Sequence, residues 1–361
     1  MSEIHERKLE HLELCVRENV EGRAATLLDD VQLLHEALPD CSLDEVDPSV
    51  ELFGHTLRAP VVIAGMTGGA TRAGEINRGL AAVAQKAGLA MGLGSQRALW
   101  KDASLLDSYR VRDVAPDILL FANLGAVQAR DAGPAAVLDL VEAVGADALC
   151  VHLNVAQELV QDEGDRDFRG CLDAIAHLVE ELPVPVVVKE TGCGFSPATL
   201  ARIRTAGVRC VDVSGAGGTS WTRVESLRGS RRQRELGETL RDWGVPTAAA
   251  IAYARRAALE VLASGGIRDA LDVVRSLALG ASAACLALPF LRAFEAGGER
   301  AAGALAERLC EGVRALLLLI GARTPRAARI APRRIGPTLR GWLEIDAEGD
   351  ATRAVPAGSG S

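Results

Sequence analysis

The stretch VPVVVKETGCGFSPATLARIRTAGVRCVDVSGAGG, residues 184–218, contains the repeating unit that decides the fold. An apolar run at 184–192 is followed by a longer stretch at helical spacing and then by a second apolar run at 208–218. Neither run alternates with polar residues, which is typical of parallel strands whose two faces are both covered. The stretch therefore predicts a strand, a helix and a second, parallel strand.

The unit recurs along residues 59–322, a length close to the roughly 250 residues of a (β/α)8 barrel. Segments between the runs, such as 74–88 and 268–280, have helical periodicity and end in Gly, as helix C-termini prefer. A ninth apolar run at 245–251 leaves a doubly wound sheet as the alternative, but its Ala-rich continuation favours a loop and helix start. We therefore predict an α/β protein with a (β/α)8 TIM barrel. Its eight strands are expected within 59–69, 89–95, 117–125, 146–154, 184–192, 208–218, 260–268 and 281–289.

Two segments lie outside the predicted barrel. Residues 1–58 are too polar and interrupted to form a core, so we expect an N-terminal extension that opens with an amphipathic helix and packs on the barrel. The C-terminal segment, 323–361, begins with six Arg and no acidic residue over 323–340. Because no aromatics are interleaved there, a solvated surface or an oligomer contact is favoured over nucleic-acid binding. The end, 346–361, has a composition typical of disorder.

Composition sets further bounds on the class of protein. The 361 residues are 48% apolar and 24% charged, which predicts a large folded core. No apolar stretch approaches the roughly 20 residues of a membrane span, and the polar start lacks a signal peptide's apolar region, so a cytoplasmic protein without membrane contact is expected. The 40 basic and 48 acidic residues give a net charge of −8, which provides no general attraction to nucleic acid.

Two residue types are informative by their positions. The eight Cys are scattered without C-x-x-C spacing, which indicates neither a zinc site nor a disulfide framework. Cys150 and Cys210 fall inside apolar runs and are predicted to lie in the core. Only four of the 40 basic residues are Lys, at positions 8, 86, 101 and 189, so each of these positions calls for an explanation.

Active sites of such barrels form at the C-terminal ends of the strands, so the polar residues that end the apolar runs are the first candidates. The glycines that follow the sixth and seventh runs allow backbone N–H groups to approach an anion, and this end of the barrel is its usual phosphate site. The candidates are Met66–Gly69, Ser95–Arg97, Asn123, His152, Asn154, Gln157, Glu158, Lys189, Glu190, Ser214–Thr219 and Ser264–Arg268.

Three of these residues allow a more specific interpretation. Lys189 directly follows a buried strand, so an anionic partner is expected, either a ligand or a strand-end acid such as Glu190. His152 and Asn154 are two residues apart and share one side of an extended strand, which suits a substrate grip. No nucleophile elbow is present, so a cofactor is expected to supply the chemistry.

Eight motifs resemble, in order along the chain, those of type 2 isopentenyl diphosphate isomerase. The resemblance implies a flavin-dependent barrel that interconverts isopentenyl and dimethylallyl diphosphate in isoprenoid precursor biosynthesis. It also implies FMN reduced by NADPH or NADH, Mg²⁺ for the diphosphate, and homo-oligomers such as tetramers or octamers. The motifs are R-K-x-E-H at 7–11, A-G-M-T-G-G at 64–69, M-G-L-G-S-Q-R at 91–97, N-L-G-A-V-Q at 123–128, H-L-N-V-A-Q-E at 152–158, V-K-E-T-G-C-G at 188–194, S-G-A-G-G-T-S-W at 214–221 and A-S-G-G-I-R at 263–268.

The resemblance assigns roles to individual positions. The catalytic group comprises Gln157, Lys189 and His11, and the Mg²⁺ ligand is Glu158, which would need water and substrate phosphate to complete the coordination. The substrate-binding positions are Arg7, Lys8, Ser95, Gln96, Arg97, His152, Asn154 and Gln157. The FMN-binding positions are Met66, Thr67, Gly68, Ser95, Asn123, Lys189, Ser214, Thr219, Gly266, Ile267, Arg268, Ala287 and Leu288.

The chain departs from the family pattern at two positions. Leu9 stands where the N-terminal motif usually has Asp, and Gly65 stands where Ser is common, so a hydroxyl beside the flavin is missing. Two alternative functions remain: an FMN-dependent oxidoreductase of the related barrel type, and a flavin or prenyl-diphosphate binder without catalysis. Stoichiometric consumption of NADPH would distinguish the first, and flavin binding without turnover would distinguish the second.

Overall fold

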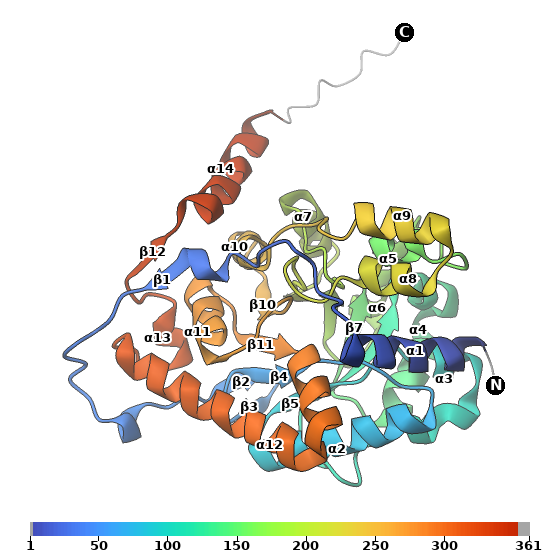
Figure 1. Cartoon of the computed structure of the whole chain (residues 1–361), viewed down its shortest axis with the longest axis horizontal. Coiled ribbons are helices and arrows are strands. Elements are labelled where there is room, and N and C mark those ends of the chain that lie inside the picture. The colour runs from blue at the N-terminus through green and yellow to red at the C-terminus, as the bar shows by residue number, and fades with distance from the viewer. Residues whose placement is uncertain (1–2, 353–361) are drawn as a thin grey trace.

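Eight parallel strands close into a barrel, which confirms the predicted fold class (Figure 1). The computed structural model describes residues 3–352, with side chains over 7–344. The strands follow chain order around the barrel, and β11 pairs with β4 to close it, so the doubly wound alternative is wrong. All eight predicted runs contain a strand: β4 (Val61–Ile63), β5 (Ala90–Gly92), β6 (Leu120–Gly125), β7 (Ala148–His152), β8 (Val186–Lys189), β9 (Cys210–Asp212), β10 (Glu260–Ala263) and β11 (Ala283–Leu286).

The strands are apolar throughout because both of their faces are buried. Phe121 and Val187 point into the barrel interior, whereas Val186 and Val188 pack outward in the layer that the helices cover. Cys150 and Cys210 lie in the interior, as predicted, and all eight Cys are free thiols.

Helices form the outer layer of the barrel (Figure 1). α10 begins at Thr247, which confirms that the ninth apolar run is a loop and helix start. Gly88 and Gly280 end α2 and α11 with φ of 65° and 112°, a left-handed conformation that Gly adopts without strain. No helix in residues 3–352 combines the length and the apolar character that crossing a bilayer requires. The covering helices are α2 (Thr71–Ala87), α4 (Ala126–Val144), α6 (Cys171–Glu181), α7 (Pro197–Thr205), α10 (Thr247–Arg256), α11 (Ala270–Leu279) and α12 (Leu288–Leu319).

The N-terminal extension covers both ends of the barrel. α1 (Glu3–Arg17) packs against α12 and lies at the C-terminal ends of the strands, where several of its side chains line a cavity. At the opposite end, Leu52 and Leu57 of a hairpin pack into the barrel interior. The remaining elements of the extension are η1 (Leu28–Asp30), β1 (Val31–Leu33), η2 (Leu43–Glu45) and the hairpin strands β2 (Val50–Leu52) and β3 (His55–Leu57).

Short helices follow several strands and surround the barrel mouth. They occupy the loops that position active sites in this architecture. α8 packs against α1, α5 and α9, which joins the loop after β9 to the N-terminal extension. These elements are α3 (Arg97–Lys101), η3 (Ala103–Ser108), α5 (Val155–Val160), α8 (Trp221–Arg228) and α9 (Arg231–Thr239).

The Arg-rich C-terminal segment is folded onto the barrel. It forms α13 (Pro325–Ala328), β12 (Arg333–Ile335) and the start of α14 (Pro337–Thr352), and β12 pairs antiparallel with β1. Arg323 donates to the backbone carbonyl of Asp40, so part of its charge serves structure. α14 extends to Thr352, so it includes the first residues of the segment 346–361 whose composition is typical of disorder. Residues 353–361 lie outside the described part of the chain.

Candidate active site

The strand register brings the predicted polar residues into one row at the barrel mouth. His152 lies opposite Gly125 on one side and Lys189 on the other, and Lys189 lies opposite Asp212. A cavity opens above this row under α1. Of the residues to which the resemblance assigns a role, all but two line it: Arg7, Lys8, His11, Met66, Thr67, Ser95, Arg97, Asn123, His152, Asn154, Gln157, Glu158, Lys189, Ser214, Thr219, Gly266, Ile267, Arg268, Ala287 and Leu288.

Gln96 and Gly68 are the two that do not line the cavity. The Gln96 side chain is 1% exposed and turned into the barrel wall, where Nε2 donates to the Leu140 carbonyl at 2.9 Å. Its neighbours in the chain face the cavity because successive side chains point in different directions. Gly68 lies against the ring of Tyr109, and a Cβ there would approach a ring carbon to 2.1 Å. Both residues support the wall and do not line the cavity.

Lys8 is held at the cavity by two oxygen atoms. Its Nζ donates to the Ser95 carbonyl at 2.9 Å and to the Tyr109 hydroxyl at 2.8 Å. The Tyr109 hydroxyl also donates to the Ser95 carbonyl at 2.8 Å. Burial, and secondly the charge of Arg7, lower the pKa of Lys8 to about 7. An anion bound beside Lys8 would relieve both effects and favour the ammonium form.

Lys189 has a carboxylate partner whose identity the sequence did not determine. Its Nζ lies 3.5 Å from Asp212 Oδ2 and donates to the Glu190 carbonyl at 2.9 Å. Burial by itself lowers the pKa of Lys189, but attraction to Asp212 and other nearby groups raises it overall. The Glu190 carboxylate instead accepts the backbone N–H groups of Thr191 and Cys193. Lys189 is therefore a fixed positive charge at the floor of the cavity.

His152 is held in one tautomer by its neighbour on β6. Its Nδ1 lies 2.8 Å from Asn123 Oδ1, and Asn123 Nδ2 donates to the Leu93 carbonyl, which fixes the orientation of the amide. Nδ1 therefore carries the hydrogen. Burial, followed by repulsion from Lys189 and Arg97, lowers the pKa of His152 to about 3. The imidazole is therefore neutral near pH 7, and it becomes easier to protonate when an anion binds.

A buried carboxylate on α8 organises the side of the cavity next to α1. Glu225 is 2% exposed and accepts the amide Nε2 of Gln157 at 2.8 Å. It also lies 3.0 Å from His11 Nε2 and 3.1 Å from an Arg228 nitrogen. Burial raises its pKa, but hydrogen bonds from His11 and Gln157 and the charge of Arg228 lower it to about 2. Glu225 is therefore ionised and fixes the positions of Gln157 and His11, two of the three predicted catalytic side chains.

Glu158 has the chemistry of a cation ligand, but few other protein groups near it could complete a metal site. It is 5% exposed, with one oxygen accepting from Asn154 Nδ2 at 2.7 Å and the other from the Asp165 N–H at 2.7 Å. Each carboxylate oxygen keeps a second lone pair for a metal ion. Over the described residues, no group of three acidic, His or Cys side chains is placed to hold a metal. A Mg²⁺ ion here would take most of its ligands from water and phosphate oxygens.

The opposite side of the cavity suits a phosphorylated planar cofactor. The Thr67 hydroxyl is buried without a hydrogen-bond partner, so it is available to a bound molecule. The loops after β9 and β10 touch through their backbones, because a Cβ on Gly218 would lie 2.3 Å from Gly266 N. The N–H groups of Gly265 and Gly266 make no hydrogen bond within the described residues. Arg268 is paired with Glu21 of the N-terminal extension.

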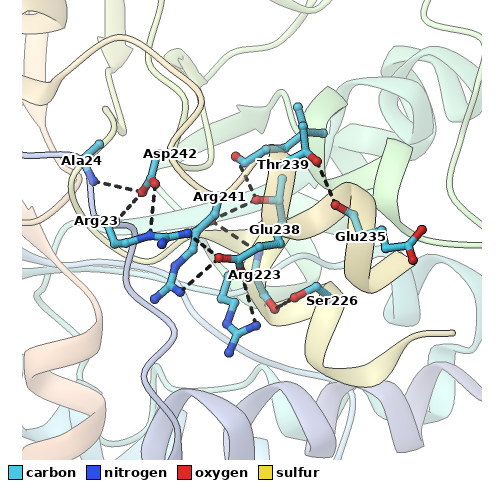
Figure 2. A network of polar contacts seen from close by, with 12 residues as sticks. Arg23, Ala24, Arg223, Ser226, Glu235, Glu238, Thr239, Arg241 and Asp242 are labelled. Atoms are coloured by element: carbon cyan, nitrogen blue, oxygen red, sulfur yellow. Dashed lines mark hydrogen bonds and ion pairs between the residues drawn. The ribbon is translucent and has the colours of Figure 1, made fainter. Parts of the chain in front are cut away.

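The segment after α1 is anchored to the α8–α9 pair beside the mouth. Asp242 Oδ1 accepts the backbone N–H groups of Arg23 and Ala24. Figure 2 shows Arg23, Arg223 and Arg241 arranged around Glu238. The exposed ion pairs contribute little individually, but the two backbone hydrogen bonds define where the segment lies. This anchoring keeps α1 over the cavity.

Sequence reasoning missed four residues of the site. Asp212 is a charged residue within an apolar run, which was a usable signal, and Tyr109 is one of only two Tyr in the chain. Trp221 lines the cavity and ends the motif at 214–221, and its ring meets that of His11 edge-on at 5.3 Å between centroids. Glu225 has no local pattern that distinguishes it from a surface helix acid.

Known proteins resemble this chain in sequence and in fold. Residues 149–332 match the family of FMN-dependent dehydrogenases. The chain is similar to the isopentenyl-diphosphate delta-isomerase of Thermococcus onnurineus, with 42% identity over 94% of this chain and 93% of that relative. The relatives of the same name from Methanosarcina mazei and Halobacterium salinarum are 43% and 46% identical, covering 94% and 81% of this chain and 94% and 82% of theirs.

Solved structures show the same fold at lower identity. A mandelate oxidase with an FMN adduct has a TM-score of 0.61 at 18% identity, covering 91% of this chain and 92% of that one. A lactate oxidase structure from Pediococcus acidilactici has a TM-score of 0.63 at 16% identity, covering 90% of this chain and 86% of that one. These likenesses concern the fold of the barrel.

Proposed function

The chain belongs to the family of isopentenyl-diphosphate delta-isomerases, and we propose that it interconverts isopentenyl and dimethylallyl diphosphate with reduced FMN and Mg²⁺. The observation that carries this proposal is the identity of 42% to the Thermococcus onnurineus relative over 94% of this chain. The reaction moves a double bond without net oxidation, so one proton is added to the terminal alkene carbon and another is removed from the allylic carbon.

The cavity residues fit FMN on the side that faces Lys189. Thr67 offers its unpartnered hydroxyl, and the N–H groups of Gly265 and Gly266 offer donors for a phosphate. Reduced FMN, when bound, supplies ring nitrogens that can give and take protons. The fixed charge of Lys189 would favour an anionic ring, and the match to FMN-dependent dehydrogenases supports this cofactor. We propose NADPH or NADH as the reductant.

The cationic residues under α1 fit the diphosphate group. Arg7, Lys8 and Arg97 line this part of the cavity, and the Arg97 Nε is buried without a partner. Their charges neutralise a diphosphate, and Lys8 and His152 become easier to protonate as it binds. Glu158 would hold Mg²⁺ against the same group. The net charge of −8 makes this local excess of positive charge necessary for binding two phosphorylated molecules.

Gln157 and His11 position the hydrocarbon end of the substrate. The Gln157 amide is held by Glu225 at 2.8 Å, and His11 is held by the same carboxylate at 3.0 Å. Neither side chain can rotate freely, so both keep the reacting carbons in one orientation. Trp221, packed against His11, closes this end of the cavity to water.

The test is an anaerobic assay of the purified protein with FMN, NADPH, Mg²⁺ and isopentenyl diphosphate, followed by product analysis. Dimethylallyl diphosphate is expected with only a catalytic trace of NADPH consumed. Gln157→Ala and Lys189→Ala should abolish turnover while the fold persists, and Glu158→Gln should weaken the response to Mg²⁺. An unchanged substrate pool, or full activity in both alanine variants, contradicts the proposal.

The FMN-dependent dehydrogenase match favours one alternative function, a flavin oxidoreductase. That activity would consume NADPH stoichiometrically in the same assay, whereas a binder without catalysis would retain FMN and convert nothing.

We also propose that the protein acts in the cytoplasm as a homo-oligomer. Leu38 and Ile330, which are 84% and 87% exposed, are candidate residues for such a contact. Light scattering on the purified protein would report a single chain if this is incorrect.

A further inference from the structure

The Arg-rich segment borders a second cavity, at the end of the barrel opposite the active site. Arg326 and Arg329 of the α13 region face Arg255 at the end of α10 across a space of about 510 Å³. The N-terminal starts of β10 and β11 form its floor, including Glu260 and Ser282. This volume lies in the range of roughly 300–1,000 Å³ that is typical of small-molecule sites.

The three guanidinium groups have few partners of their own. Arg329 donates through Nη2 to the Ser282 hydroxyl at 3.1 Å, and its Nε is buried without a partner. The side chains of Arg255 and Arg326 form no hydrogen bond or ion pair within the described residues, and both are exposed and line the cavity. Burial, and then repulsion from Arg255, lower the pKa of Arg329. The charge of Glu260 offsets part of this repulsion, so the like charges are only partly compensated.

The acidic residues of the wall do not neutralise this cluster. Glu51 accepts a hydrogen bond from the Thr56 hydroxyl, and Glu260 forms no ion pair with any of the three arginines in the described part of the chain. Three arginines against two carboxylates leave an excess of one positive charge. The Arg329 side chain is half-buried and its Nε has no partner, so an anion in the cavity would offset the cost of its partial burial.

We propose that this cavity binds a small phosphate-bearing anion, at a site separate from the barrel mouth. Guanidinium groups present paired N–H donors that match phosphate oxygens, and three of them converge here with the Ser282 hydroxyl. Arg326 and Arg329 belong to the segment whose six Arg the active site does not use. Binding would hold α13 against α10 and the strand starts, and so order the C-terminal segment.

The test uses inorganic phosphate and hydrogen exchange on the FMN-loaded protein, because exchange locates the bound anion. Phosphate should slow amide exchange in residues 324–330, and sodium chloride at equal ionic strength should not. The variants Arg255→Ala and Arg326→Ala remove exposed side chains and should fold. Each variant should need about tenfold more phosphate to reach the same protection from exchange, since each removes a charge-assisted contact.

Arg334→Ala is the matched control, because Arg334 is an exposed residue of the same Arg-rich segment and does not line the cavity. It should keep the wild-type response to phosphate. Protection confined to the barrel mouth, or an equal response in all three variants, overturns the proposal. Isomerase turnover does not enter this test, so the outcome is independent of the proposed function.

Discussion

Replacing Glu225 by Gln tests the organisation of the active site most directly. The substitution keeps the size of the side chain and removes one negative charge that is 2% exposed. That charge lies 3.0 Å from His11 Nε2 and 3.1 Å from an Arg228 nitrogen. The variant therefore leaves the Arg228 charge with one partner fewer and weakens the hold on Gln157.

The magnitude follows from the pKa of the carboxyl. A fall from 4.5 to about 2, at about 1.36 kcal/mol for each pKa unit, gives roughly 3 kcal/mol of stability at pH 7. Because the folded pKa is depressed, this contribution is complete above pH 4.5 and is lost as the pH falls towards 2. The difference between wild type and variant should therefore shrink to roughly half by pH 3.

Urea unfolding at pH 7, 5 and 3 measures this difference. Glu235→Gln is the control: Glu235 is a 65% exposed acid of α9 that pairs with Arg231, and its loss should change stability by less than about 0.5 kcal/mol. Turnover should fall more than substrate affinity, because Gln157 loses its orientation. A Glu225→Gln variant as stable as the control, or a difference that grows at low pH, would refute the reasoning.

Three further outcomes are expected. Because the pKa of Lys8 is about 7 in the free enzyme, kcat/KM should fall as the pH rises above 7, and Lys8→Arg should remove that fall; a flat wild-type profile would contradict the role of this charge. Asp212→Asn removes the carboxylate that lies 3.5 Å from the Lys189 ammonium. The free energy of unfolding, measured with urea, should fall by about 3 kcal/mol or more, and an unchanged stability would count against the pair. Gly68→Ala places a Cβ 2.1 Å from a buried tyrosine ring and should cost about 1–3 kcal/mol. Gly303→Ala lies in helix α12 with open space around it and should leave stability unchanged or raise it by up to about 1 kcal/mol in the same thermal unfolding experiment; equal effects would contradict the predicted clash.

The barrel and most of the cavity follow from the sequence because their determinants are local. An uninterrupted apolar run such as 184–192 specifies a strand buried on both faces, and eight such runs separated by helices leave few topologies. The strands end at the same face, so residues that follow them, such as His152 and Lys189, are brought together. Motif order then identified the family, which the similarity to isopentenyl-diphosphate delta-isomerases bears out.

Other features depend on contacts between residues far apart in the chain, and only the tertiary structure decided them. Asp212 became the partner of Lys189 through the register of β8 and β9. Glu225 lies more than 200 residues after His11 in the chain. Only the packing of α8 on α1 brings the Glu225 carboxylate to the His11 ring. Gln96 sits within a matching motif, yet the direction of its side chain turns it into the wall.

The N-terminal extension shows the same division at the scale of whole elements. Its sequence predicted one helix packed on the barrel, and the structure shows that it covers the mouth with α1 and fills the opposite end with Leu52 and Leu57. The Arg-rich segment likewise had no predicted structure, but β12 forms by pairing with β1, about 300 residues earlier. Local pattern determines which elements form. Which side chains meet is determined by three-dimensional packing, because the free energy of each contact depends on partners that the neighbouring sequence does not specify.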